Sequence, residues 1–575
     1  MKLKDATRLE IGLAGIERLA ARARDLDPRA QGWAIAGMCA LLAAVFILML
    51  ILPGKTFSFI YVHDMMIFFD GAHRVLDGQL PNRDFHTPLG LLAYLLPALG
   101  LWLSGSLGGM MPWATTLFAL IFLPMLIHVC VSRLPLAYSA VFAVFALALV
   151  IGPASIGETF PSFGMFYNRW GYALLAILFL LVLPQQRGRP RLLADWLVAG
   201  SVLLLSFYLK ISYFAIALGF MALLLLFGET RKLAVGALAI AAAGAALVHL
   251  SWGGTASYLS DIGMAAKVTG AVRISAIGLV RMTIENAAML LPFLMVLGLA
   301  IASRASLRTL FLCLVMAGAG LLLYNQNFQE PGIMTLIPAA IVAALALPRR
   351  AGRDTGKTPH ALAALLLVAT LALPPAVLAA ESILLHAWMI VRGGYPDEYL
   401  AQIDGFMTQE VSRPAAGEPG FAQSRNAYRG GYANLRMLNI IRRQGLRQEL
   451  AQPEYFWTIE DGARLLRGEP RLAGKVLTLD MANPLNALAG RSGPRGLDSW
   501  YHAGRSFNEA TYRNPEQMFA DVDVVMVPKA PVQPASHLLL TKLYGEYIGR
   551  HYELVATSDY WNGYRRKQPI LSGIG

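Results

Sequence analysis

The sequence has few charged residues, and this shortage indicates the class of protein. Only 15% of the 575 residues are Asp, Glu, Lys or Arg, whereas 56% are hydrophobic and the mean hydropathy is +0.51. Soluble domains average about 25% charged residues. Apolar runs recur between Ala34 and Ala379, and at roughly 20 residues each they are long enough to cross a bilayer as helices. The composition therefore excludes an ordinary soluble protein and predicts a polytopic membrane protein.

Cysteine is also scarce. Cys39, Cys130 and Cys313 each lie within an apolar run, which argues against a disulfide framework or a metal cluster and predicts three small core residues. Common catalytic motifs are missing, because the sequence has no GxxxxGK[ST] phosphate loop, no HExxH and no GxSxG. ATP-driven transport is therefore not supported. We expect no required cofactor and no metal site, with a divalent ion left open as an alternative.

The net charge of +13 is concentrated in short links between apolar runs. Such basic links are typical of cytoplasmic loops, so we expect membrane lipids rather than nucleic acid as partners. The charge pattern predicts a cytoplasmic N-terminus and an outer C-terminal domain, and we expect a multi-pass protein of the bacterial inner membrane. The basic links are residues 187–191, 231–232, 304–308 and 349–357.

The predicted fold is an all-α polytopic membrane domain with about 11–13 transmembrane helices, followed by a C-terminal mixed α/β extracytoplasmic domain. The first span, near 32–52, reads as a retained signal anchor, and 88–104, which contains Pro97, is placed in the outer interface. The link 251–285 is expected on the outer side. The domain calls are a cytoplasmic amphipathic helix at 1–30, a membrane domain at 31–390 with its first outer loop at 53–88, and the outer domain at 391–575.

The C-terminal region has no apolar run of membrane length. Short β-like runs appear at Val476–Leu479, Val522–Val527 and Tyr552–Ala556, and a helical pattern spans Ala433–Leu450. The run before Pro528 predicts a buried strand. These features predict a compact domain of ordinary size.

A polar stretch, Tyr61–Gly90, follows the first span and contains four aspartates, three histidines and two arginines. A carboxylate just beyond a span lies within reach of a lipid headgroup and can accept a proton from an attacking hydroxyl. Asp64 is the aspartate nearest the span and is the candidate base, with a helix N-cap as the alternative. Asp70 and Asp77 read as solvated helix positions, and Asp84 reads as either a turn residue or a ligand of the acceptor.

This stretch resembles the GT-C superfamily of polyprenyl-phosphate-sugar glycosyltransferases, which includes aminoarabinose transferases and protein O-mannosyltransferases. The similarity is carried by His63–Asp64, by Gly78, Pro81, Arg83, Asp84 and Phe85, and by Thr87–Pro88–Leu89. It implies that Asp64 is the catalytic base and that the donor lies in a groove open to the membrane. The sequence departs from the pattern at Met65, where many relatives have a second acid, and it lacks the Lys-Pro-Pro of the aminoarabinose transferases.

A departing phosphate needs cationic or hydrogen-bonding partners. For Arg169 and Lys210 the structural alternatives are snorkelling to headgroups and a polar turn. The candidates for binding the donor phosphate or sugar are Lys210, Arg169, Arg83, His86 and His63, and the candidates for binding the acceptor or sugar are Asp84, Asn168, Asn327 and Glu330.

The function that follows is transfer of a sugar from a polyprenyl-phosphate donor to a hydroxyl of a lipid, glycan or cell-wall polymer at the outer membrane face, with inversion at the anomeric carbon. The first alternative is a lipid-linked polysaccharide ligase or polymerase. The second is a transporter or flippase, which would bury charges at mid-membrane. The third is a membrane-anchored binding protein in which Asp64 is dispensable.

Overall fold

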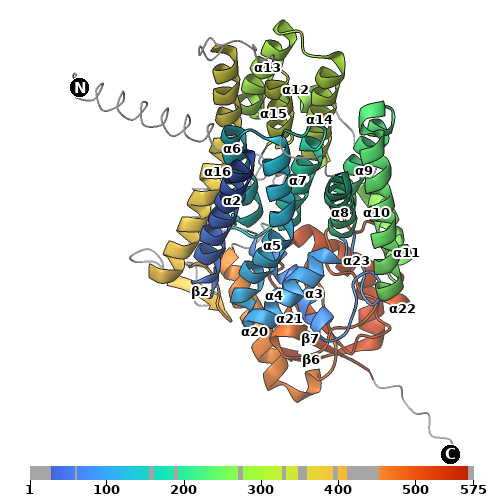
Figure 1. Ribbon diagram of the computed structural model, residues 1–575. Helices are drawn as coiled ribbons and strands as arrows, with labels where there is room; N and C mark the ends of the chain where they lie inside the picture. Colours follow the sequence, from blue (N-terminus) through green and yellow to red (C-terminus); the bar gives the residue numbers. More distant parts are fainter. Residues whose placement is uncertain are drawn as a thin grey trace, which may run out of the picture.

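The computed structural model describes residues 27–58, 61–153, 161–186, 192–269, 276–326, 332–347, 359–392, 399–410 and 452–567. A bundle of long apolar helices makes up the larger part, and a smaller part of mixed helices and strands sits at one end of it (Figure 1). The predicted fold class, an all-α membrane domain with a C-terminal α/β region, is confirmed.

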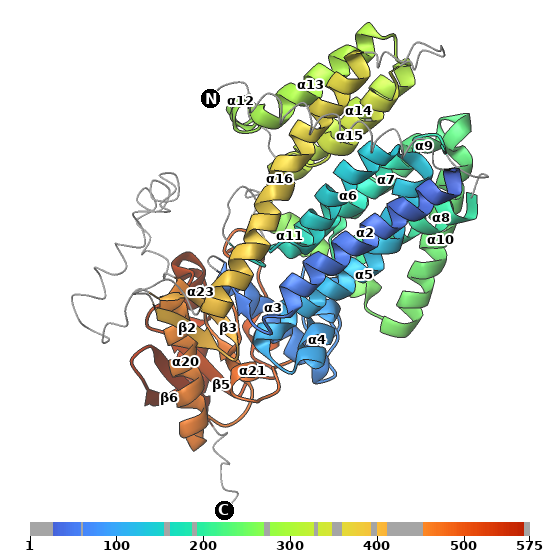
Figure 2. The same cartoon turned by 60° about the vertical axis from the view of Figure 1, so that its left-hand side comes forward.

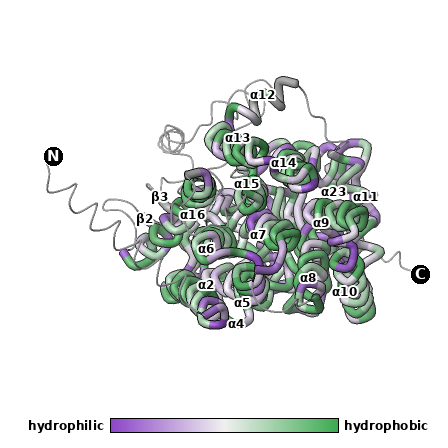
Figure 3. Tube along the Cα trace, turned by 45° about the horizontal axis from the view of Figure 1, so that its top comes forward, coloured by the Kyte–Doolittle hydropathy of each residue, from purple (hydrophilic) through white to green (hydrophobic). Residues whose placement is uncertain are grey.

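Six helices of the described chain are long and apolar enough to cross a membrane. Hydrophobic residues cover most of their length, as Figure 3 shows for α2, α5, α8 and α10. The predicted multi-pass membrane protein is therefore confirmed, whereas the number of crossings and their direction remain predictions. The six are α2 (Pro28–Ile51), α5 (Leu107–Arg133), α8 (Leu192–Leu209), α10 (Gly228–Trp252), α14 (Leu307–Gln326) and α16 (Pro359–Arg392).

Shorter helices lie between these six where the apolar pattern places spans, except Leu92–Ser104, which forms a helix in the segment expected at the outer interface. Residues of α7 and α15 are almost all buried, as is most of α6, because other helices surround them. The shorter helices are α4 (Leu92–Ser104), α6 (Leu136–Ile151), α7 (Phe166–Leu180), α9 (Ile211–Leu225), α13 (Ala287–Ala302) and α15 (Leu336–Leu345).

Local sequence signals account for several helix ends. Pro28 occupies the first turn of α2, and the Asp27 carboxylate accepts a hydrogen bond from the backbone N–H of Arg29, the usual arrangement at a helix start. The Ser106 hydroxyl accepts a hydrogen bond from the N–H of Gly109 and caps α5. The expected outer link 251–285 is largely helical, since it contains α11 (Thr255–Thr269) and α12 (Ala276–Glu285).

The polar stretch after α2 forms a helix, α3 (Val62–Leu76), with its mid-section packed inside the protein. The prediction that Asp70 is solvated is wrong, because its side chain is only 1% exposed and pairs with Arg74. One face of α3 packs against the C-terminal region, and this contact buries Asp70. Asp77 lies on the exposed side, as expected.

The C-terminal region contains a four-stranded sheet of order β4-β5-β7-β6. The strands are β4 (Val476–Thr478), β5 (Val524–Pro528), β6 (Tyr552–Thr557) and β7 (Trp561–Arg566). The predicted β-like runs and the buried central strand are therefore confirmed. The helices of this region are α20 (Gln452–Gly468), α21 (Leu485–Leu488), α22 (Pro515–Met518) and α23 (Pro534–His551), with a short 3-10 turn, η1 (Pro470–Leu472). The predicted helices at 1–30, apart from its last residues, and at 433–450 lie outside the described residues.

A second, three-stranded sheet ties the start of the C-terminal region to the segment after α2. Its order is β1-β3-β2, with β1 (Thr56–Phe57) parallel to β3 (Phe406–Glu410) and β2 (Tyr399–Ile403) antiparallel to it. The turn between β2 and β3 also caps α5, because the carboxylate of Asp404 accepts a hydrogen bond from the N–H of Leu107. Figure 2 shows α16 running from the bundle to this junction, and α3 and α4 beside it.

Candidate active site

Asp64 lies in the first turn of α3, at the end of the bundle that meets the C-terminal region. The helix begins after Tyr61, whose backbone is left-handed with φ 57°. The Asp64 side chain is 17% exposed, and its Oδ1 lies 3.5 Å from Nε2 of His63. The unpaired N–H groups of a first helical turn favour a negative charge. The carboxylate is thus largely enclosed yet still in contact with solvent.

The surroundings of Asp64 raise its affinity for a proton. Burial raises the pKa of its carboxyl group above the usual value, while the charges of His63 and Arg505 act in the opposite direction. Nearby, burial and the charges of Arg505 and His63 lower the pKa of His502 to about 3. His502 is therefore neutral near neutral pH, and the charged neighbours of Asp64 come from both α3 and the C-terminal region.

Aromatic contacts join α3 to α7. The ring of Phe68, one turn after Asp64, lies 6.0 Å from the ring of Tyr167. Lys210 places its Nζ 5.1 Å from the centre of the same tyrosine ring and donates a hydrogen bond of 2.8 Å to Oδ1 of Asn168. The cation of Lys210 and the start of α3 thus share one aromatic neighbour.

The break between α8 and α9 positions Lys210. Its backbone is extended with φ −159°, so it precedes α9 rather than continuing α8. The N–H of Gly90 donates to the carbonyl of Leu209 at 3.1 Å, and a Cβ on Gly90 would lie 2.1 Å from the carbonyl oxygen of Tyr208. Only glycine allows this close approach, which holds the polar stretch against the Lys210 turn.

Arg169 and Asn168 lie in the first turn of α7, and both are buried. Nη1 of Arg169 lies 3.4 Å from the carbonyl oxygen of Gly164. Because Asn168 holds Lys210, two cations predicted to contact the donor phosphate come from neighbouring segments of the structure. Their role in phosphate binding stays a prediction.

His86 lies in a different environment, beside a carboxylate. Its Nδ1 is 2.9 Å from Oδ1 of Asp261 on α11, and the same aspartate accepts hydrogen bonds from Asn82 and from the N–H of Thr87. Backbone hydrogen bonds on both sides of His86 join it to Leu497 and Ser499. His86 therefore lies at the contact between the polar stretch, α11 and the C-terminal region.

Asp84 uses both carboxylate oxygens. Oδ2 accepts a hydrogen bond from the N–H of Leu80 at 2.8 Å, which closes the turn, and Oδ1 lies 2.5 Å from Nη1 of Arg495. Arg83 is 49% exposed, with Nη2 3.3 Å from the same carboxylate. The turn role of Asp84 is evident, and its contact with an acceptor stays a prediction. Asn327 and Glu330 lie outside the described residues.

Several side chains at this junction are not found by sequence reasoning. Asp261 lies in an expected outer link close to Trp252, and this position is only a weak indication of a functional residue. The C-terminal residues form no recognisable sequence motif. Among the described residues no group of three or more His, Cys, Asp or Glu could hold a metal ion. The residues missed are Asp261, Asp498, His502, Arg505 and Arg513.

No family model and no curated protein matches the sequence. Among solved structures, the chain is similar to ArnT from Cupriavidus metallidurans in the apo state, with 13% identity and a TM-score of 0.45, over 93% of this chain and 98% of that one. It is also similar to ArnT from the same organism bound to undecaprenyl phosphate, with 12% identity and a TM-score of 0.44, over 93% and 99% of the two chains.

Proposed function

We propose that the protein is a membrane glycosyltransferase that moves a sugar from a polyprenyl-phosphate donor to an acceptor hydroxyl at the outer face of the membrane. The observation that carries the proposal is the position of Asp64. This largely enclosed carboxylate begins a helix at the end of the apolar bundle, and its proton affinity is raised by burial. The motif resemblance of the surrounding stretch supplies the donor class.

In the proposed reaction, the acceptor oxygen attacks the anomeric carbon while its proton passes to the Asp64 carboxylate. The bond between the anomeric carbon and the phosphate oxygen breaks, and the electron pair leaves with the phosphate. One direct displacement inverts the anomeric configuration. A base whose pKa is raised accepts this proton more readily than an ordinary carboxylate does.

The leaving phosphate gains negative charge, so the site needs cations near the donor. Lys210 and Arg169 suit this role, since both lie beside the start of α7 and the Lys210 amine already donates to a neutral amide oxygen. A phosphate oxygen is a stronger acceptor than that amide. We assign the donor phosphate to these two side chains, and His63 to the sugar because its Nδ1 is buried without a hydrogen-bond partner among the described residues.

The C-terminal region contributes to the proposed site and does not merely cover it. The positive charge of Arg505 lowers the pKa of Asp64. The same charge also lowers the pKa of His502. Both belong to a segment that continues to Trp500 and Asp498 in a neighbouring cleft. We propose that this segment positions the acceptor beside Asp64.

The test uses purified full-length protein supplied with membrane lipid extract and labelled polyprenyl-phosphate sugars. The variants are Asp64→Asn and Asp64→Ala, and the matched control is Asp77→Asn, which removes an exposed carboxylate from the end of the same helix. We expect sugar transfer in wild type and control, and loss of transfer with retained donor binding in both Asp64 variants. Unchanged transfer by the Asp64 variants would rule out the proposed base.

A further inference from the structure

Helix α11 buries two polar side chains against the rest of the protein. Of its 15 residues only Tyr258 and Asp261 are buried, and they lie three positions apart, on one face of the helix. A surface helix ordinarily packs through an apolar stripe. Because the buried face of α11 carries a phenol hydroxyl and a carboxylate, directional hydrogen bonds help to fix the position of this helix.

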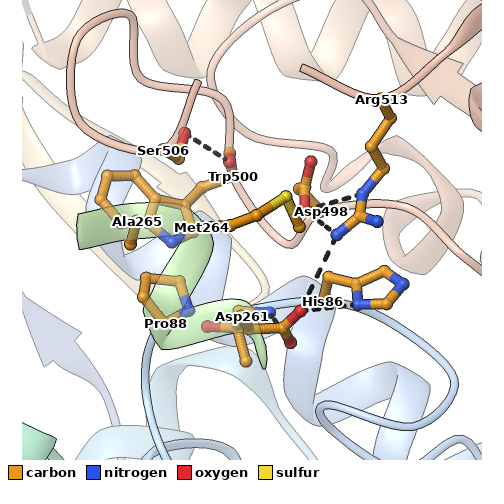
Figure 4. Close-up of a pocket in the computed structure, with 10 residues that line it drawn as sticks. His86, Pro88, Asp261, Met264, Ala265, Asp498, Trp500, Ser506 and Arg513 are labelled. Atoms are coloured by element: carbon orange, nitrogen blue, oxygen red, sulfur yellow. Dashed lines mark hydrogen bonds and ion pairs between the residues drawn. The ribbon is translucent and has the colours of Figure 1, made fainter. Parts of the chain in front are cut away.

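Asp261 holds the polar stretch. Its Oδ1 lies 2.9 Å from Nδ1 of His86, and its Oδ2 accepts hydrogen bonds from Nδ2 of Asn82 at 3.0 Å and from the N–H of Thr87 at 3.1 Å. Figure 4 shows the Asp261 carboxylate turned toward His86 and Arg513. One carboxylate from α11 therefore fixes both ends of the turn between Asn82 and Thr87.

Tyr258 holds the break between α8 and α9. Its hydroxyl donates to the carbonyl of Phe207, three residues before Lys210, at 3.0 Å. The backbone of Ile211, the residue after Lys210, forms a second hydrogen bond with the same hydroxyl. The rings of Tyr258 and Phe207 meet edge to face with their centres 5.5 Å apart. The hydroxyl is thus bonded on both sides of Lys210, and it fixes the direction in which the chain leaves α8.

The two segments that α11 holds also contact each other. The N–H of Gly90 donates to the carbonyl of Leu209 at 3.1 Å. Trp252, at the end of α10 and three residues before α11, donates from Nε1 to the carbonyl of Pro81 at 3.0 Å. Helix α11 therefore connects the polar stretch to the Lys210 break, and both segments carry residues predicted to bind the donor.

We infer that α11 is a positioning element of the donor site, in which Tyr258 places Lys210 and Asp261 places the polar stretch against it. The inference rests on the proposed transferase function and deepens it, because it names residues that act on the donor only through other side chains. A cation held in place before the donor arrives loses less freedom on binding. The effect of α11 should therefore appear in donor affinity rather than in the rate of transfer from bound donor.

Hydrogen–deuterium exchange of the purified full-length protein in detergent micelles tests the placement of the Lys210 break. Tyr258→Phe removes the hydroxyl and keeps the ring, and the matched control Ser260→Ala removes an exposed hydroxyl from the same helix. We expect Tyr258→Phe to speed exchange at the amides of residues 207–214 by about threefold to tenfold, and the control to exchange like wild type. Wild-type exchange in Tyr258→Phe would overturn the inference.

A double-variant cycle shows whether Tyr258 acts through Lys210. Tyr258→Phe should weaken binding of the lipid-linked donor by about threefold to tenfold and leave the single-turnover rate at saturating donor unchanged. In the Lys210→Met background the same change should have no further effect on donor affinity, because the amine that it positions is absent. Equal weakening in both backgrounds is the result of a merely structural hydroxyl and would overturn the inference.

Asp261→Asn tests the hold on the polar stretch. It keeps the volume of the side chain but replaces one acceptor with a donor, which faces the N–H donors of Asn82 and Thr87. We expect faster exchange across residues 81–90 and weaker donor binding, and wild-type values for both would count against the assignment. If Asp261→Asn folds poorly, the cycle with Tyr258→Phe decides the inference.

The exchange measurement does not depend on sugar transfer, so the inference and the proposed function fail separately. Wild-type exchange in Tyr258→Phe, together with lost transfer in Asp64→Asn, would overturn the role of α11 and leave the transferase standing. Faster exchange and weaker donor binding in Tyr258→Phe, together with wild-type transfer in Asp64→Asn, would overturn the proposed base and support the role of α11.

Discussion

The ion pair between Asp70 and Arg74 holds α3 against the C-terminal region, and its loss should be costly. Arg74 is fully buried and donates from Nε to Oδ2 of Asp70 at 2.7 Å and from Nη1 to the carbonyl of Pro494 at 2.5 Å. Arg74→Met removes the cation and leaves the carboxylate, which is 1% exposed, without its partner. Breaking a buried pair in this way costs about 3–5 kcal/mol. We expect a clear fall in the thermal unfolding midpoint of the purified protein.

The double variant Asp70→Asn/Arg74→Met separates the cost of the orphaned charge from the loss of packing. It removes both charges while it keeps similar side-chain volumes, and such replacements are often close to neutral. We therefore expect the double variant to recover most of the stability that the single variant loses. Equal midpoints for single and double variants would refute the reasoning.

The pH dependence of the stability of these variants gives a second check, because the direction of the change is predicted. Burial raises the pKa of Asp70, while Arg74 and, more weakly, the charge of His73 lower it, so Arg74→Met removes the largest lowering effect and leaves burial dominant. The folded variant then binds a proton more tightly than the unfolded chain, and its stability rises as the pH falls toward the ordinary pKa of a carboxyl group. The deficit of the single variant relative to the double variant should shrink at low pH. A deficit that is constant or grows would contradict the assignment.

Three further predictions concern the site and its support. Lys210→Met should weaken donor binding about tenfold or more, as measured by donor titration, and Lys210→Arg should weaken it less; equal affinities would count against a phosphate contact. Because burial raises the pKa of Asp64 above its usual value of 3.8, the transfer rate should fall on the acid side with a midpoint above that value, and a midpoint below it would contradict an enclosed base. Gly493→Ala should lower the free energy of unfolding by about 1–3 kcal/mol, since its Cβ would lie 2.7 Å from Cζ of Arg74, whereas Gly468→Ala, which meets nothing within 4 Å, serves as the control.

The sequence predicts much of the fold because hydrophobic patterns determine where a chain can be buried. The apolar runs predict the long helices, and the run before Pro528 predicts the central strand β5. The pattern misses β1, because two residues are too few to show the alternation of a strand. The pairing of β1 with β3 joins positions 350 residues apart. It also misplaces Asp70, because an acid followed four residues later by an arginine looks the same on a solvated helix as in a buried contact.

The site is predictable only where its residues follow one another in the sequence. Asp64 and His63 become candidates because they follow a span, and Lys210 becomes one because it interrupts an apolar stretch; their roles stay predictions. Asp261 and Asp498 are missed, since each has meaning only beside His86 and Arg513, and tertiary packing alone brings them together. Charged residues in a polar domain give no local signal that distinguishes a ligand from a solvated surface.

The central claim is that Asp64 accepts the proton of the attacking hydroxyl. The most direct measurement is the single-turnover rate of sugar transfer with donor already bound, compared between wild type, Asp64→Asn and Asp77→Asn. The account predicts a rate lower by a factor of about 10²–10⁴ for Asp64→Asn, unchanged donor affinity, and a wild-type rate for Asp77→Asn. A wild-type rate in Asp64→Asn would contradict it.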